Sequence, residues 1–113
     1  MKKKVFLVEV RLLLGEFKKE LNALGYCAKL IGGLKTKGYT RHDIDLDIKM
    51  PFSDPPDEEI FYIINDFGNE LWKKHGLEFD LNFWFKGKPK YKLDQGGFFE
   101  YQEDGSLEAF SPF

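Results

Sequence analysis

The segment that most restricts the fold of this chain is Asp43-Ile44-Asp45-Leu46-Asp47-Ile48, in which acidic and branched apolar residues alternate. Successive side chains of a strand point to opposite faces, so the alternation predicts a strand with an acidic face and a core face. Aspartate is disfavoured in strands, and like charges on one face repel. A divalent cation would compensate that cost, because hard cations bind carboxylate oxygens. The alternative is an edge strand whose acidic face is simply solvated.

A second segment, Glu78–Phe85, repeats the same phase. One face carries Phe79, Leu81, Phe83 and Phe85, and the other carries the polar residues Glu78, Asp80 and Asn82. If this strand pairs beside the first, Asp80 approaches Asp43 and Asp45. Three acids that converge from two strands predict a metal site rather than a solvated surface.

Nine residues separate a glycine pair, Gly32-Gly33, from Asp43. An apolar residue, the glycine pair, a spacer, Asp-x-Asp at Asp43 and Asp45, and the later Asp80 together resemble the pattern of the DNA polymerase β-like nucleotidyltransferase superfamily. The resemblance covers about residues 6–85 and leaves the last 28 residues outside it. It implies a minimal, stand-alone nucleotidyltransferase domain.

The resemblance also implies roles for the three acids. Asp43 and Asp45 would hold the nucleotide-bound metal ion, Mg²⁺ or Mn²⁺, and Asp45 and Asp80 would hold a second one. Asp80 would then take the proton of the attacking hydroxyl. Two such ions can activate the attacking oxygen and stabilise the leaving one. Asp47 lies one step further along the strand and is expected to be a bystander.

The glycine pair and the spacer are expected to form the nucleotide-binding segment. Gly32 and Gly33 would let backbone amides approach the phosphates, although an ordinary tight turn is the alternative. Three cations follow where the β- and γ-phosphates would need them, although any one of them could be a solvated side chain: Lys35, Lys37 and Arg41.

The reaction implied is transfer of a nucleoside monophosphate from a nucleoside triphosphate such as ATP to a hydroxyl of a protein, a tRNA end or a small molecule. Small members of the superfamily often act with a separate helical protein, sometimes as a toxin–antitoxin pair, and this chain is similar in size. The alternative is a catalytically degenerate binding module that acts through protein–protein contacts. A net charge of −2 offers no basic field for a long duplex, which disfavours a sequence-reading nucleic-acid binder.

Periodicity along the chain predicts an α+β fold with a small mixed sheet packed against helices, and the resemblance implies a nucleotidyltransferase-like, two-layer domain. At 113 residues the chain is expected to form one domain, with a core at about 6–85 and a C-terminal strand and hairpin at 86–113. One helix is expected at 8–24, although residues 5–9 could form a short strand. Residues 34–41 are a short helix or a loop. A further helix is expected to be capped by Ser53 or Asp54 and to end at Gly76.

The C-terminal region combines lysines with aromatic rings. Alternating lysines between residues 86 and 92 either contact substrate phosphates or protect an edge strand by charge. A hairpin is expected to turn at Asp104-Gly105. Its rings give more aromatic surface than a small domain readily buries, which predicts self-association or a protein partner there: Phe98, Phe99, Tyr101, Phe110 and Phe113.

The remaining composition bears on the compartment. Cys27 is the only cysteine, so no intramolecular disulfide can form, as expected in a reducing cytosol. Cys27 itself is expected to be a core residue beside the glycine turn. No stretch approaches the roughly 18 apolar residues of a membrane span. The sequence therefore predicts a cytoplasmic protein without a membrane partner.

Overall fold

Strand β4 (Asp43–Lys49) lies within a sheet, and its alternating residues divide between the two faces of that sheet. In the computed structural model, which describes residues 3–111, the apolar residues of β4 are fully buried, with exposed fractions of 0%. Its three aspartates lie half-buried on the opposite face. The strand expected from the alternation is confirmed, and so is its division into a core face and an acidic face.

The main sheet is mixed. β4 and β5 run parallel, whereas all other neighbouring strands run antiparallel. A parallel pair needs a long crossover, and helix α3 supplies it. A separate two-stranded sheet pairs β1 (Val5–Phe6) with β3 (Tyr39–Thr40). The six strands of the main sheet lie in the order β2 (Cys27–Ile31), β4, β5 (Glu78–Phe85), β6 (Lys88–Asp94), β7 (Gly97–Tyr101) and β8 (Leu107–Ala109).

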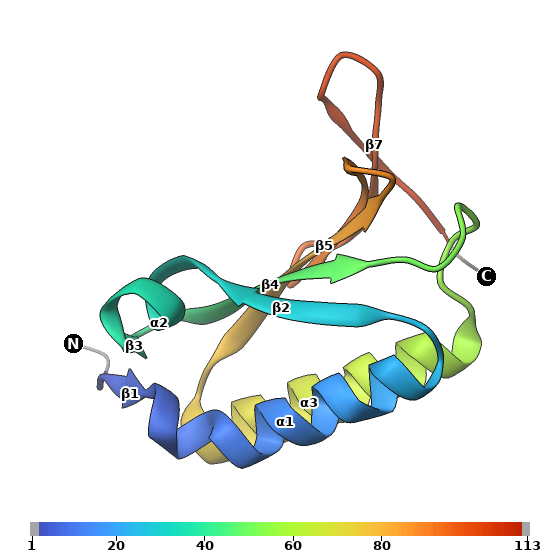
Figure 1. Ribbon diagram of the computed structural model, residues 1–113. Coiled ribbons are helices and arrows are strands. Elements are labelled where there is room, and N and C mark those ends of the chain that lie inside the picture. The colour runs from blue at the N-terminus through green and yellow to red at the C-terminus, as the bar shows by residue number, and fades with distance from the viewer. Residues whose placement is uncertain (1–2, 112–113) are drawn as a thin grey trace.

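Two long helices, α1 (Leu7–Ala23) and α3 (Glu58–His75), lie side by side on one face of the main sheet (Figure 1). Phe17 of α1 stacks on Phe67 of α3 with ring centroids 4.0 Å apart, so the two helices pack against each other over the core. We call the opposite face, which carries the aspartates of β4, the open face. The molecule is thus an α+β fold with a mixed sheet packed against helices. Within residues 3–111, no helix has the length and apolar character to cross a membrane.

The short segments settle the alternatives left by the sequence. Residues 5–9 form both structures, because β1 is followed at once by α1. The glycine pair and the residues after it form the short helix α2 (Gly32–Lys37), and β3 follows. The cap expected at Ser53 or Asp54 is wrong: the Asp57 carboxylate accepts a hydrogen bond from the Ile60 amide at 3.2 Å. Prolines follow Asp54 directly and hold the preceding backbone extended, so α3 begins only after them.

The lysine-rich strand β6 is not an edge strand, and that interpretation of its charges is wrong. β7 pairs with β6 along its other side, and β8 follows as the edge. The register between β5 and β6 shifts at Phe83/Trp84. The expected hairpin is confirmed, and its two strands extend the sheet beyond β6.

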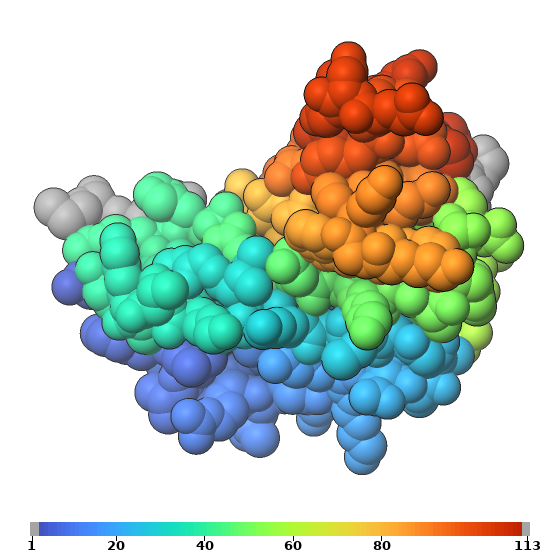
Figure 2. Space-filling view, turned by 45° about the horizontal axis from the view of Figure 1, so that its top comes forward, coloured from blue at the N-terminus to red at the C-terminus, as the bar shows by residue number. Residues whose placement is uncertain are grey.

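The C-terminal rings divide between the core and the surface. Phe98 is 8% exposed and stacks on Tyr91 with centroids 5.3 Å apart, and Phe110 packs against both rings. Phe99 and Tyr101 are half-buried, and Phe113 lies outside the described residues. The hairpin, orange to red in Figure 2, rises above the rest of the open face. The aromatic surface offered to a partner is therefore smaller than the sequence suggests.

Candidate metal centre

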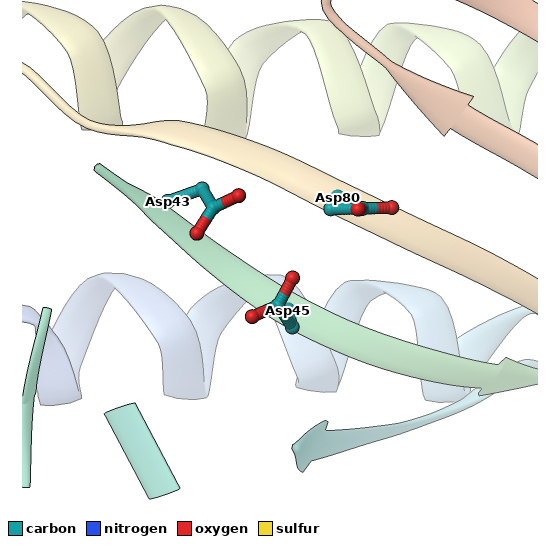
Figure 3. A group of neighbouring side chains, drawn as sticks. All are labelled: Asp43, Asp45 and Asp80. Carbon is teal, nitrogen blue, oxygen red and sulfur yellow. The ribbon is translucent and has the colours of Figure 1, made fainter. Parts of the chain in front are cut away.

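The parallel register of β4 and β5 brings three carboxylates together on the open face. Asp45 pairs with Asp80 across the two strands. Single carboxylate oxygens of Asp43, Asp45 and Asp80 lie within 4.8 Å of one another. Figure 3 shows the first two on β4 and the third on the neighbouring β5. The acids singled out in the sequence therefore converge, as their common phase predicted.

Asp45 carries the electrostatic cost of this arrangement. Burial, followed by the negative charges of Asp43 and Asp80, raises the pKa of Asp45 to about 6. The charge of Lys92 acts in the opposite direction but does not cancel the effect. A carboxylate that is destabilised in this way gains from a nearby cation, because an opposite charge favours the ionised form.

Gly32 packs directly against this carboxylate. Its φ of +72° lies in the left-handed region, and a Cβ at this position would collide with the Asp45 carboxyl group. Gly33 differs, because it has no positive φ and a Cβ there would meet only the Tyr39 carbonyl oxygen at 4.0 Å. The first glycine of the pair is thus required both by the turn and by the close approach to Asp45.

Lys92 is a member of the site that the sequence did not single out. Its ammonium donates to both oxygens of Asp80, at 2.8 and 3.0 Å, and the two side chains are only 21% and 28% exposed. Burial acts against the charged ammonium, but the hydrogen bond and charge of Asp80 outweigh it, and the pKa of Lys92 is raised. Lys92 is distinguished from the other lysines of the strand only by the register of β5 and β6, in which it pairs with Asn82.

The remaining candidate residues lie on α2, on β4 and in the bend between β3 and β4. Lys35 and Lys37 are exposed on α2, and Arg41 is half-buried in the bend before β4. Asp47 is not among the three acids whose oxygens converge. His42 is exposed, and its backbone carbonyl accepts a hydrogen bond from the Glu78 amide at 2.9 Å.

Two hollows flank this part of the sheet. One, of about 380 Å³, lies between α3, the start of β5 and the turn between β6 and β7. Its lining includes two carboxylates, three amides and an exposed indole but no lysine or arginine: Glu78, Asp94, Asn65, Asn69, Gln95 and Trp72. The other, of about 310 Å³, lies further along the open face and is lined by Cys27 and several lysines.

The prediction that Cys27 is a core residue is wrong. Cys27 is exposed, because the pairing of β2 with β4 aligns it with the exposed Lys49. The strand phase turns Leu30, rather than Cys27, into the core. This thiol is therefore part of the open face, at its far end from the three acids.

The donor set of the acidic cluster is chemically uniform. All its candidate ligand atoms are carboxylate oxygens, and oxygen ligands suit Mg²⁺ and Mn²⁺ better than softer metals, which prefer imidazole or thiolate. The residues present therefore fit the hard divalent cation expected from the sequence. Comparisons of the chain with protein-family models, curated proteins and solved structures found no match.

Proposed function

We propose that this protein is a metal-dependent nucleotidyltransferase with the minimal fold of the DNA polymerase β-like superfamily. The observation that carries the proposal is the convergence of Asp43, Asp45 and Asp80 on the open face of two parallel strands. The close packing of Gly32 against Asp45 supports it, because the glycine turn and the acids then belong to one site. The proposed cofactor is Mg²⁺ or Mn²⁺.

Asp43 and Asp45 would hold the ion that carries the triphosphate. When bound, that ion neutralises charge on the phosphates and on the leaving group. Asp80, on the neighbouring strand, would hold the acceptor hydroxyl and receive its proton. Gly32 and Gly33 would admit the phosphates close to the backbone, with Lys35, Lys37 and Arg41 as their proposed counter-charges.

The transfer itself is a substitution at phosphorus. The hydroxyl oxygen of the acceptor forms a bond to the α-phosphorus, and the bond from that phosphorus to the oxygen bridging the β-phosphate breaks. The electron pair leaves with pyrophosphate, and the hydroxyl proton passes to the Asp80 carboxylate. Because little covalent chemistry falls to the protein, positioning and electrostatic stabilisation account for most of the rate.

We propose as acceptor a hydroxyl of a protein, a tRNA end or a small molecule that reaches Asp80 from the open face. The hollow lined by Glu78 lies between α3 and the sheet, on the side opposite the three acids, and therefore takes no part in the proposed site.

A protein partner belongs to the same proposal. Val8 and Leu12, one turn apart on α1, are 72% and 84% exposed, and Leu107 of the hairpin is 43% exposed. Adjacent exposed apolar side chains of this kind mark protein contacts. A helical partner, as in a toxin–antitoxin-like pair, would cover the helix, and a second copy of the chain would meet the hairpin.

A second candidate function is the degenerate binding module. The observation in its favour is the ion pair between Lys92 and Asp80, because an acid already neutralised by an ammonium has less need of a metal. Turnover separates the two candidates, because the binding module would transfer nothing.

The test is a transfer assay with labelled nucleoside triphosphates, Mg²⁺ and a cell extract as the source of acceptor. The wild-type protein should label an acceptor and release pyrophosphate. Asp80→Asn should lose transfer by about 100-fold or more while keeping much of the nucleotide affinity, since a positioned general base typically contributes about 10² to 10⁴ in rate. Asp43→Asn should lose both, and Asp47→Asn, the matched control on the same face, should lose neither. A wild type that binds no triphosphate with either metal would exclude the enzyme, and binding without turnover would assign the binding module.

A further inference from the structure

Lys92 brings a fixed positive charge into the acidic cluster from a third strand. β6 lies next to β5 on the side away from β4, so Lys92 reaches Asp80 from the flank opposite Asp45. Its ammonium contacts both Asp80 oxygens, at 2.8 and 3.0 Å. Both side chains are partly buried, with 21% and 28% of their surface exposed, which strengthens the pair relative to a fully exposed one.

We propose that Lys92 takes the place of the second metal ion, so that the cluster binds a single divalent cation between Asp43 and Asp45. This inference rests on the proposed function, whose superfamily resemblance implies two ions. A lysine ammonium is a compact point charge with three donors, and it can neutralise a carboxylate that would otherwise bind a metal. A divalent ion at Asp80 would have to displace this ammonium or lie beside a like charge.

The same arrangement gives Lys92 a positioning role. Contact with both oxygens restricts the rotation of the Asp80 carboxylate and holds it in its place beside Asp45. The lone pairs that the ammonium does not use remain free to accept from an acceptor hydroxyl. Lys92 thus acts through Asp80 rather than on the substrate.

The strand offers a matched control for the charge. Lys90 lies on β6, two residues away, and no hydrogen bond or ion pair joins it to Asp80 among the contacts of the described residues. Lys90→Gln removes the same charge from the same strand and leaves Asp80 with its partner. Lys92→Arg keeps a positive charge beside Asp80.

The experiment is a calorimetric titration of the purified proteins with Mn²⁺, without nucleotide. The wild type, Lys90→Gln and Lys92→Arg should each bind one ion. Lys92→Gln should bind a second ion, or bind its single ion at least about tenfold more tightly. Two ions in the wild type, or equal stoichiometry and affinity in wild type and Lys92→Gln, would overturn the inference while leaving the metal-dependent function intact. No Mn²⁺ binding by any of the four proteins would remove the proposed function as well.

Discussion

Asp45 and Asp47 are both aspartates on the open face of β4, yet their surroundings differ. Across the sheet, Asp47 stands between Lys29 on β2 and Asn82 on β5. The Asn82 side chain in turn accepts a hydrogen bond from the Tyr101 hydroxyl at 2.7 Å. The neighbours of Asp45 are Ile31 and Asp80, one without a charge and one with the same charge.

This difference shows that the alternating aspartates of β4 are not by themselves enough to form the site. One end of the open face of β4 combines acids with a lysine and an amide, as ordinary polar surfaces do. The other end concentrates negative charge, and the pKa of Asp45 is raised there to about 6, by burial first and by its acidic neighbours second. A group destabilised in this way, within reach of two further acids, is where a bound cation has the most to contribute.

The largest effect expected is the stabilisation of the protein by metal. Mn²⁺ at 100 times its Kd should stabilise the native state by about 2.7 kcal/mol, because it binds the native state alone. Asp45→Asn should abolish the rise in melting temperature, whereas Asp47→Asn should keep it. Thermal melts of the three proteins with and without Mn²⁺ measure this. Equal responses of the two variants would mean that both ends of the face bind metal, or neither does.

The next effect concerns the glycine beside Asp45. Gly32→Ala should destabilise the metal-free protein by about 2 kcal/mol, from the left-handed backbone and the collision with the Asp45 carboxylate. Gly33→Ala is the control, because its backbone is unstrained and its new Cβ meets nothing closer than 4.0 Å. Urea unfolding gives both values. A Gly32→Ala protein as stable as Gly33→Ala would show that the glycine turn is not tied to Asp45.

The smallest effect is the pH dependence of metal-free stability. The folded protein raises the pKa of Asp45 from its ordinary value of 3.8 to about 6, so the cost of ionised Asp45 to the free energy of unfolding is absent below pH 4 and complete above pH 6. At pH 7, Asp45→Asn should exceed the wild type in stability by about 1 kcal/mol, less than the full shift implies because the group is partly hydrated. The difference should vanish as the pH falls from 7 to 4, and Asp47→Asn should show no such trend. Chemical unfolding at several pH values measures the difference, and a constant advantage of Asp45→Asn would contradict the electrostatic cause.

The site was predictable as far as local periodicity reaches. The phases of residues 43–48 and 78–85 place Asp43, Asp45 and Asp80 on one face, because alternation is a property of each strand alone. The two long helices were equally predictable from their apolar spacing. The ends of these helices were harder to predict. Several residues before α3 could have capped it, and because two prolines precede the helix, Asp57 is the residue that does.

What the sequence did not reveal depends on pairing between distant segments. Lys92 is one of four alternating lysines, and its contact with Asp80 follows from the register of β5 with β6. The interior place of β6 depends on the hairpin that extends the sheet past it. The exposure of Cys27 likewise follows from the register of β2 against β4. Such registers are set by the whole sheet, and a shift of one residue would turn each side chain to the other face.

The central claim, that three acids of β4 and β5 form a metal site, is tested most directly by crystals of the wild-type protein grown or soaked with Mn²⁺. Anomalous scattering from manganese should give a peak in contact with carboxylate oxygens of Asp43 and Asp45, on the open face beside Asp80. The same crystals should show no manganese at Asp47. A map without a peak at the three acids, at Mn²⁺ concentrations that saturate any site seen in solution, would contradict the account.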